Sequence, residues 1–438
     1  MKISVIGTGY LGATHAVCMA ELGFDVVGVD VDQSKVLRLQ RGEVPFFEPG
    51  LEPLLRKHVE NGRLTFSSDL QAAAGWADVH FVCVGTPQRT NALSADTSYV
   101  EQAVDGLAPH LAPGALVVGK STVPVGTAAR LRERLRAQVA PRTHADLVWN
   151  PEFLREGHAL HDTLHPDRIV VGTEGDVGVA TLREVYAGAL ESGTPFLVTG
   201  LETAELVKVA ANAFLATKIS FINAMSEVCE ATGGDVVALA EALGHDERIG
   251  SRFLGAGLGF GGGCLPKDIR AFQARCIELG LNRSVAFLAE VDEVNQRRRA
   301  RTVALAHEML GGRVKDRRIV VLGAAFKPDS DDVRDSPALD VADQLYMRGG
   351  DVVVHDPQAT EPARHRSPDL VYVDSLAEAY AGADLLLLLT EWSEFRVLDP
   401  AVVGSRVRQR KIVDGRNVLP VPEWERAGWQ LRALGRGA

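Results

Sequence analysis

The stretch that decides the fold is Ile3-Ser4-Val5-Ile6-Gly7-Thr8-Gly9-Tyr10-Leu11-Gly12, where an apolar run leads into three spaced glycines and a helical pattern. Gly7 permits a tight turn, Gly9 lets the backbone approach a pyrophosphate, and Gly12 lets the helix pack on the strand. Asp30 ends the next apolar run. An acidic residue there accepts hydrogen bonds from ribose hydroxyls and repels a 2′-phosphate. The stretch therefore predicts an NAD site, and a plain glycine turn is the alternative.

Outward from this turn, apolar runs alternate with helical stretches through the first 200 residues. This alternation predicts parallel βαβ units, so residues 1–200 are expected to form one doubly wound NAD-binding domain. The expected strands after the first are Val26–Val29, Phe81–Val84, Leu116–Val118, Leu147–Trp149 and Ile169–Val171.

The middle of the chain differs in character. From Leu201 to Ala231 there is no proline or glycine, and apolar residues recur at helical spacing, which predicts one long helix. Further helices are expected over residues 235–243, 267–279 and 284–309. Residues 201–312 are therefore predicted to form an all-α domain.

Strand and helix alternate again from Arg318, which predicts a second α/β domain over residues 313–438. Its first strand leads into Leu322-Gly323-Ala324-Ala325-Phe326-Lys327 without the three spaced glycines, so no second dinucleotide is expected there. The predicted fold class is α/β, with two Rossmann-like doubly wound domains joined by the all-α domain and its long helix. The expected elements of the second α/β domain are strands over residues 319–323, 351–356, 385–389 and 412–413 and a helix over 339–347.

Composition narrows the classes of function. The 438 residues carry 47 basic and 57 acidic side chains, a net charge of −10, which disfavours nucleic-acid binding. No apolar run reaches the ~18 residues of a membrane span, and the N-terminus lacks a signal-peptide pattern. The five cysteines lack CxxC spacing and indicate neither disulfides nor a metal site. A reducing cytoplasm is therefore expected.

One cysteine differs from the other four. Cys264 follows the glycine-rich segment Gly257–Gly263, and Pro266 suits the first turn of a helix, so the thiol is expected just before a helix N-terminus. The partial positive charge there and the neighbouring Lys267 favour a thiolate. The other four lie in apolar contexts and are expected to pack in cores: Cys18, Cys83, Cys229 and Cys276.

Polar residues at helical spacing are further candidates. Lys208 and Asn212 share an otherwise apolar face of the long helix, so they need partners such as an oxyanion or a carboxylate. Glu152 and Glu156 are also four residues apart, with a solvated or interdomain ion-pair role as the alternative. The run Arg297–Arg299 is expected to be a solvated helix face.

Seven motifs follow one another along essentially the whole chain. They are Gly7–Gly12, Val84–Pro87, Ser121–Thr127, Asn150–Gly157, Thr203–Glu205 with Lys208 and Asn212, Gly259–Asp268, and Phe326-Lys327 with Val333–Pro337. In this order they resemble the nucleotide-sugar dehydrogenases that oxidise UDP-glucose, with GDP-mannose relatives. The resemblance implies a four-electron oxidation of a sugar primary alcohol to a carboxylate, UDP-glucose giving UDP-glucuronate, with two NAD in succession and one water. A cysteine thiohemiacetal and thioester retain the reactive aldehyde.

The resemblance also implies roles for individual residues. Cys264 is the nucleophile, while Lys208 and Asn212 stabilise the charge that develops on the reacting oxygen. The group that positions and deprotonates water is Thr122, Glu152 and Asp268. The expected NAD contacts are Gly7, Gly9, Tyr10, Leu11, Gly12, Asp30, Lys35, Thr86, Thr122, Glu156, Lys267 and Arg334. The expected substrate contacts are Glu152, Phe153, Leu154, Arg155, Glu156, Lys208, Asn212, Arg248, Phe253, Leu254, Gly261, Cys264, Lys327 and Arg416.

The same resemblance implies an oligomer, and it leaves alternatives open. A homodimer or higher homo-oligomer is expected to form on the central helical domain, with Arg248 donated across its interface. Gly263 and the segment Gly255–Gly257 are smaller than the family pattern, so the same chemistry on dTDP-glucose, GDP-mannose or a UDP-N-acetylhexosamine is the first alternative. A non-catalytic regulator that binds NAD or a nucleotide sugar would not need a thiol beside a lysine. A two-electron alcohol dehydrogenase would leave Cys264 unused.

Overall fold

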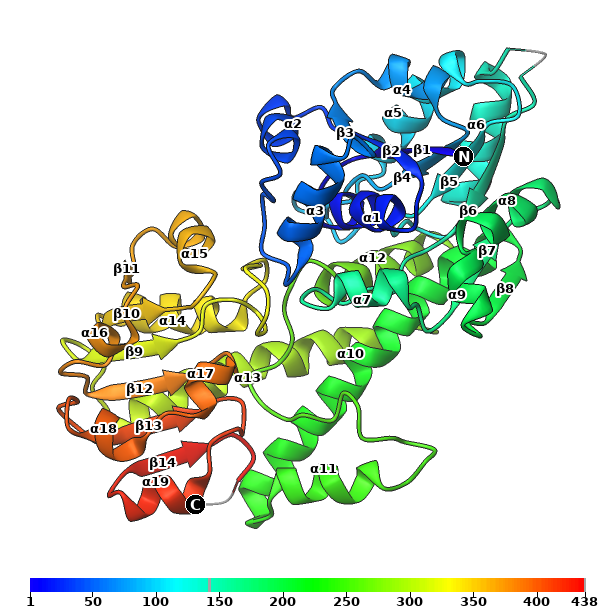
Figure 1. Ribbon diagram of the computed structural model, residues 1–438. Helices are drawn as coiled ribbons and strands as arrows, with labels where there is room; N and C mark the ends of the chain where they lie inside the picture. The colour runs from blue at the N-terminus through cyan, green and yellow to red at the C-terminus, as the bar shows by residue number, and fades with distance from the viewer. Residues whose placement is uncertain (141–142, 437–438) are drawn as a thin grey trace. The chain divides into compact units, whose positions relative to one another are not determined.

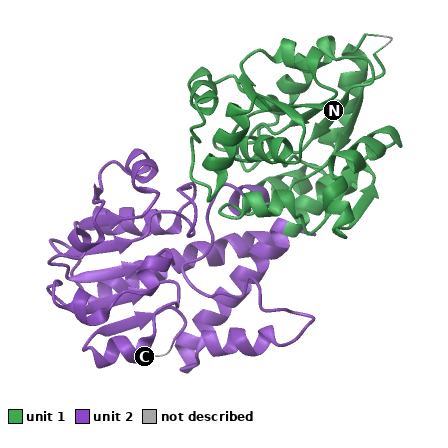
Figure 2. Ribbon diagram, in the orientation of Figure 1, with its two compact units in different colours: residues 1–211, 270–280 green, residues 212–269, 281–438 purple. Residues whose placement is uncertain are grey.

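The computed structural model of the chain describes residues 1–140 and 143–436. The chain forms two compact units, residues 1–211 with 270–280 and residues 212–269 with 281–438 (Figure 2). Each unit contains one sheet. Within the described ranges, no helix combines the length and the apolar character needed to cross a membrane.

The first unit is built on an eight-stranded sheet in the order β3-β2-β1-β4-β5-β6-β7-β8 (Figure 1). The chain steps outward from β1 to β3 and then from β4 in the other direction, which is the doubly wound arrangement. The strands are β1 (Lys2–Ile6), β2 (Asp25–Val29), β3 (Leu64–Ser67), β4 (Val79–Val82), β5 (Leu116–Gly119), β6 (Asp146–Trp149), β7 (Ile169–Gly172) and β8 (Phe196–Thr199).

Helices pack on both faces of this sheet. Successive strand residues point to opposite faces, so Phe81 joins a core with α1 and α3, while Val82 joins a second core with α5 and α6. The helices of this unit are α1 (Tyr10–Glu21), α2 (Gln33–Gln40), α3 (Leu51–Glu60), α4 (Leu70–Trp76), α5 (Ser98–Leu107), the short 3-10 helix η1 (Ala108–His110), α6 (Thr127–Gln138), α7 (Ala159–Leu164), α8 (Val177–Val185) and α9 (Ala187–Glu191).

The prediction of parallel pairing is wrong at one place. β6 and β7 are antiparallel and meet through Trp149 and Gly172. A parallel neighbour requires a crossover, usually a helix packed on the sheet. The connection between these two strands contains α7, which is only six residues long and packs against α1. The predicted strand Phe81–Val84 also lies two residues earlier, as β4.

The second unit has a six-stranded sheet in the order β11-β10-β9-β12-β13-β14, again doubly wound and parallel throughout. Its strands are β9 (Arg318–Leu322), β10 (Asp351–His355), β11 (Val371–Tyr372), β12 (Leu385–Leu388), β13 (Lys411–Asp414) and β14 (Gln430–Ala433). Its short and medium helices are α14 (Pro337–Met347), α15 (Thr360–Arg366), α16 (Leu376–Ala379), α17 (Ser393–Arg396), α18 (Pro400–Gly404) and α19 (Val421–Arg426).

The turn after β9 is held by the carboxylate that follows the next strand, as the turn after β1 is held by Asp30. The Asp356 carboxylate accepts the N–H groups of Ala324 and Ala325 at 2.7 and 3.0 Å, and the indole N–H of Trp392 at 3.1 Å. In the first unit, the corresponding position after β1 is the glycine turn Gly7–Gly12. The two sheets therefore share a strand order, but their first turns differ in sequence.

The long helix of the middle region is α10 (Leu201–Thr232), as predicted. It is followed by α11 (Val236–Gly244), α12 (Leu265–Glu278) and α13 (Phe287–Met309), in agreement with the expected helices. The predicted α/β fold with two Rossmann-like sheets and a long connecting helix is thereby confirmed. The division into three domains, with boundaries after residues 200 and 312, stays a prediction.

The expectation of a solvated Arg297–Arg299 face is wrong for two of the three residues. Arg298 is fully buried and Arg299 is 5% exposed. Arg298 donates to Ser226 and to Glu230, each at 3.0 Å, and Arg299 lies 3.3 Å from Asp340. Helix α13 is packed on several sides, so these guanidinium groups are buried and paired.

Candidate active site

The turn between β1 and α1 has the shape that a dinucleotide pyrophosphate requires. A Cβ on Gly7 would lie 2.8 Å from Val84, and a Cβ on Gly12 would lie 1.8 Å from the Gly7 carbonyl oxygen. Gly9 has no neighbour within 4 Å of its Cβ position and caps α1 without a side chain. The turn is thus closed on the protein side and open at Gly9, before a helix N-terminus that attracts phosphate.

Asp30 stands at the end of β2, 8% exposed, where an NAD ribose is expected. Its carboxylate accepts from Thr8 N–H at 2.8 Å, from Asp32 N–H at 3.0 Å and from Lys35 Nζ at 2.9 Å. Burial acts to raise the pKa of Asp30, but these hydrogen bonds outweigh it and lower the pKa below its usual value. Asp30 is therefore held as an anion at the cofactor turn.

The other predicted cofactor residues of the first unit surround the same turn. Thr86 donates its hydroxyl to the Thr122 carbonyl at 2.7 Å, which joins the loops after β4 and β5. The Tyr10 hydroxyl donates to Glu48 and accepts the Gly157 N–H at 3.0 Å. Burial raises the pKa of Tyr10, so this phenol stays neutral. The residues present fit NAD.

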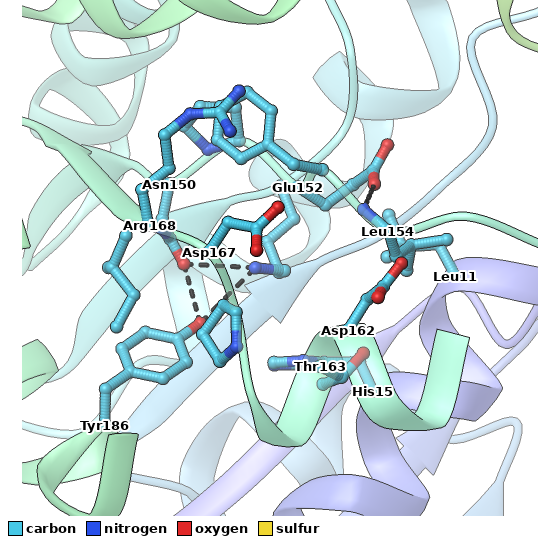
Figure 3. Close-up of a pocket in the computed structure, with 15 residues that line it drawn as sticks. Leu11, His15, Asn150, Glu152, Leu154, Asp162, Thr163, Asp167, Arg168 and Tyr186 are labelled. Carbon is cyan, nitrogen blue, oxygen red and sulfur yellow. Dashed lines mark hydrogen bonds between the residues drawn. The ribbon is translucent and has the colours of Figure 1, made fainter. Parts of the chain in front are cut away.

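The segment after β6 carries Glu152, and its start is fixed by a buried polar cluster (Figure 3). The Asn150 Oδ1 accepts from Tyr186 at 2.7 Å and from the buried Lys120 Nζ at 3.1 Å. The Asn150 amide donates to the Val170 carbonyl at 2.8 Å. These bonds come from three separate elements, so the backbone leading into Glu152 has little freedom.

A cavity of about 60 Å³ lies beside this cluster within the first unit (Figure 3). The predicted site residues Leu11, Glu152, Phe153 and Leu154 line it, and the other lining residues were not predicted from the sequence. The Arg168 guanidinium stacks 3.8 Å above the Phe153 ring. The cavity is lined by Leu11, His15, Lys120, Asn150, Pro151, Glu152, Phe153, Leu154, Asp162, Thr163, Pro166, Asp167, Arg168, Ile169 and Tyr186.

Lys208 and Glu152 form a buried ion pair in the first unit. The Lys208 Nζ lies 2.7 Å from the Glu152 Oε1, and the two side chains are 6% and 11% exposed. The second oxygen of Glu152 accepts the Leu154 N–H at 2.7 Å. The inward-pointing lysine thus has a carboxylate partner, as its position on an apolar helix face requires. Opening such a pair is expensive unless another anion replaces the carboxylate.

In the second unit, Asp268 is the centre of a similar arrangement. It is 2% exposed and accepts from the Asn212 amide at 2.7 Å and from Lys267 Nζ at 2.6 Å. Cys264 directly precedes α12, and its carbonyl accepts the Asp268 N–H at 2.9 Å, so Cys264 caps this helix. Its side chain is exposed. The helix N-terminus places partial positive charge near this residue.

The other four cysteines are buried, as predicted. Burial raises the pKa of Cys18 and of Cys83 to about 12, and it raises the pKa of Cys276. These three thiols therefore stay protonated at neutral pH.

The glycine-rich loop before Cys264 is bound tightly within the second unit. The Arg416 guanidinium donates to the Gly259 carbonyl at 3.0 Å and to the Phe326 carbonyl at 3.2 Å. A Cβ on Gly261 would lie 2.4 Å from the Asp335 carbonyl, and one on Gly263 would lie 2.2 Å from the Arg334 guanidinium. The first contact is with backbone and is fixed, whereas the second is with the end of an exposed side chain that can move aside. Arg416 therefore holds the glycine-rich loop, and its contact with a ligand stays a prediction.

The remaining predicted substrate residues lie at different depths. Arg155 makes a bidentate ion pair with Asp162 at 2.8 and 2.7 Å, and Arg248 is 89% exposed beside Asp246. Phe253 adopts a left-handed backbone conformation with φ of 65°, which costs about 1–3 kcal/mol and is common at ligand sites. The other members are Leu254, buried, Glu156, buried, and Lys327, near the Phe326 ring.

Sequence reasoning missed three buried residues that hold these loops. Glu48 accepts the N–H groups of Gly157 and Ala159 at 2.6 and 2.7 Å, and so fixes the end of the Glu152 segment. Lys120 fixes its start. Glu205 holds the start of α6. Glu205 lies inside one of the seven motifs and Lys120 directly precedes another, which was the available signal, whereas nothing in the local sequence marks Glu48.

The sheet order, the glycine turn and the anionic Asp30 define a dinucleotide-binding protein. Three models of the UDP-glucose/GDP-mannose dehydrogenase family match the chain, and the chain belongs to this family. The matched parts are described as the NAD binding domain (residues 1–190), the central domain (202–297) and the UDP binding domain (320–421).

Individual relatives match over the full length. UDP-glucose 6-dehydrogenase of Rhizobium meliloti is 42% identical, with 100% of both chains covered. UDP-glucose 6-dehydrogenase of Pseudomonas aeruginosa is 39% identical over 100% of this chain and 98% of the relative. Among solved structures, a UDP-glucose dehydrogenase from Pyrobaculum islandicum is 40% identical with a TM-score of 0.90, over 100% of this chain and 98% of the other.

Proposed function

We propose that the protein oxidises the primary alcohol at C6 of UDP-glucose to a carboxylate and so forms UDP-glucuronate. The observation that carries this proposal is Cys264, the exposed cysteine of five, which caps a helix next to the buried group Asp268–Asn212–Lys267. Two-electron oxidation of an alcohol does not require a thiol. Oxidation of the aldehyde is made possible by one.

The first oxidation removes two electrons from C6 and leaves an aldehyde. Lys208 and Asn212 donate to the C6 oxygen and stabilise the negative charge that develops on it. The ammonium group of Lys208 is held in place by Glu152 at 2.7 Å. A cation fixed in this way loses little entropy when the transition state forms, because its rotamer is already set.

The second oxidation proceeds through the Cys264 sulfur. The thiolate adds to the aldehyde carbon to give a thiohemiacetal, and loss of two further electrons gives a thioester. Asp268 and Glu152, with Thr122, position and deprotonate the water that adds to the thioester carbon. The C–S bond then breaks and the Cys264 thiolate leaves, which restores the enzyme.

When bound, NAD would supply the hydride acceptor for each oxidation. The residues that hold it in this proposal are the turn Gly7–Gly12 at the pyrophosphate and Asp30 with Lys35 at a ribose. Thr86, Thr122, Glu156, Lys267 and Arg334 are further contacts. The arrangement at Asp30 favours NAD over NADP, because an anion there repels a 2′-phosphate.

The proposed substrate contacts come from several segments of the chain. The substrate is held by the segment Phe153–Glu156, by Phe253, Leu254 and Gly261, and by Lys327 and Arg416. The chain has three domains, over residues 1–200, 201–312 and 313–438, and acts in the cytoplasm as a homodimer or higher homo-oligomer built on the central helices. Exposed apolar side chains along α10, among them Phe214, Phe221 and Val228, support an interface there, and Arg248 contributes across it.

The test of this function is the stoichiometry of the reaction. Purified protein with limiting UDP-glucose and excess NAD is expected to form two NADH for each sugar. One NADH for each sugar would replace the proposal with a two-electron dehydrogenase, and no NADH would leave a binding protein. A panel with dTDP-glucose, GDP-mannose and UDP-N-acetylhexosamines, ranked by kcat/KM, then decides the nucleotide and the sugar.

A further inference from the structure

Glu205 is a buried carboxylate to which the proposed reaction assigns no role. It lies in the second turn of α10 and is 2% exposed. Its two oxygens accept the N–H groups of Gly126 and Ala128, both at 2.6 Å. These N–H groups belong to the start of α6, where Gly126 is the cap residue and has no side chain to offer. A carboxylate from another helix thus takes the place of a local N-cap.

The loop that Glu205 holds carries a predicted cofactor residue. Residues 120–126 connect β5 with α6 and include Thr122. At the start of the loop, Thr122 accepts the Thr86 hydroxyl at 2.7 Å. At its end, the Val125 carbonyl accepts Arg275 Nε at 2.9 Å, and Glu205 holds the next N–H groups. The loop is therefore fastened at both ends within one compact unit.

We propose that Glu205 is a positioning residue for the cofactor: its carboxylate fixes the β5–α6 loop so that Thr122 stays in register with the NAD site. The inference rests on the proposed role of Thr122 at the cofactor. Lys208 follows Glu205 by three residues on the same helix, and it holds Glu152. The start of α10 thereby fastens both the cofactor loop and the carboxylate of the Glu152 segment.

The charge state of Glu205 controls this contact. Burial raises its pKa to about 7, although the N–H groups of Ala128 and Gly126 act to lower it. Glu202 on α10 also raises the pKa, and Arg275 on α12 and Arg130 on α6 donate to the Val125 and Gly126 carbonyls of the loop that Glu205 holds. Protonation turns one acceptor oxygen into an O–H that faces an N–H. The loop is therefore held firmly above neutral pH and loosely below it.

The experiment is a fluorescence titration of NADH against the full-length protein without nucleotide sugar, between pH 6 and pH 8.5. The wild-type dissociation constant is expected to rise about tenfold as the pH falls through 7, the scale of losing one hydrogen bond to a charged group. Glu205→Gln presents an N–H in place of an acceptor. It is expected to bind about tenfold more weakly at the high end and to show no pH step.

Glu202→Gln is the matched control, because it makes the same change on an exposed side chain three residues away. It is expected to keep the wild-type affinity and the step, moved slightly to lower pH. Equal NADH affinity and an equal step in Glu205→Gln would overturn the inference. If that variant does not fold, Glu205→Asp, which keeps the charge but is shorter, is expected to bind weakly and to keep the step; wild-type affinity there would also overturn it. Because no sugar is present, turnover of UDP-glucose is judged separately.

Discussion

Substitutions at two glycines of one turn separate cofactor binding from folding. Gly9 has φ of −68°, an ordinary value, and nothing lies within 4 Å of its Cβ position. Gly9→Ala therefore meets no clash and no backbone strain in the protein. Its free energy of unfolding is expected to stay within about 1 kcal/mol of the wild type, because alanine also restricts the unfolded chain.

The same methyl group occupies the open side of the turn, where the cofactor phosphates must approach the N–H groups at the start of α1. Hydrogen bonds to charged groups contribute about 1.5–3 kcal/mol each, so loss of one or two of them weakens NADH by about 100-fold. Gly12→Ala provides the contrast. Its Cβ would lie 1.8 Å from the Gly7 carbonyl oxygen, a backbone atom that no side-chain rotation can move away. We expect a loss of about 3 kcal/mol or more in stability.

The assay is NADH fluorescence titration together with urea unfolding for both variants. NADH affinity in Gly9→Ala within threefold of the wild type would refute the reasoning, since the open position would then not face the pyrophosphate. Gly12→Ala with unchanged stability would contradict the close contact between α1 and the turn.

Two further predictions concern catalysis and pH. Lys208→Met is expected to lower kcat for UDP-glucose oxidation by about 10²–10³ while NADH affinity stays the same, because it removes charge stabilisation of the reacting oxygen; an unchanged kcat in steady-state assays would remove Lys208 from this role. His80 is fully buried, and burial lowers its pKa to about 4. The unfolded chain therefore binds a proton near pH 6.5 that the folded chain refuses until about pH 4, so stability falls as pH falls through this window, by about 3 kcal/mol in all. Urea midpoints across the window measure this loss of stability. His80→Leu is expected to make stability fall less steeply with falling pH, and the fall that remains includes the contribution of His15.

Much of the fold could be predicted because the inner strands are apolar on both faces. Leu385–Leu388 and Ile169–Gly172 are buried at every position, so each forms a continuous apolar run. The strands that were missed lie at the edges of the sheets. β8 is the short apolar run Phe196–Thr199, whose side chains are half-buried or exposed, and β11 has only two residues. Pairing with a neighbour, which a single sequence does not reveal, makes them strands.

The candidate site was predictable in its residues and less so in its contacts. Lys208 and Asn212 on an apolar helix face require polar partners, and the structure supplies Glu152 and Asp268. Helical spacing indicates that partners exist but does not identify them. Glu152 lies 56 residues before Lys208, and Asp268 lies 56 residues after Asn212. Arg416 illustrates the same limit, because charge alone does not indicate that its guanidinium binds the Gly259 carbonyl.

The central claim is that Cys264 takes the substrate beyond the aldehyde. The most direct measurement is the rate of UDP-glucuronate formation by Cys264→Ala, with an acid-quenched wild-type sample examined by mass spectrometry during turnover. The account predicts no UDP-glucuronate from the variant and a sugar-nucleotide acyl adduct on the wild-type peptide that contains Cys264. UDP-glucuronate formed by the variant at the wild-type rate, with no adduct in the wild type, would contradict it.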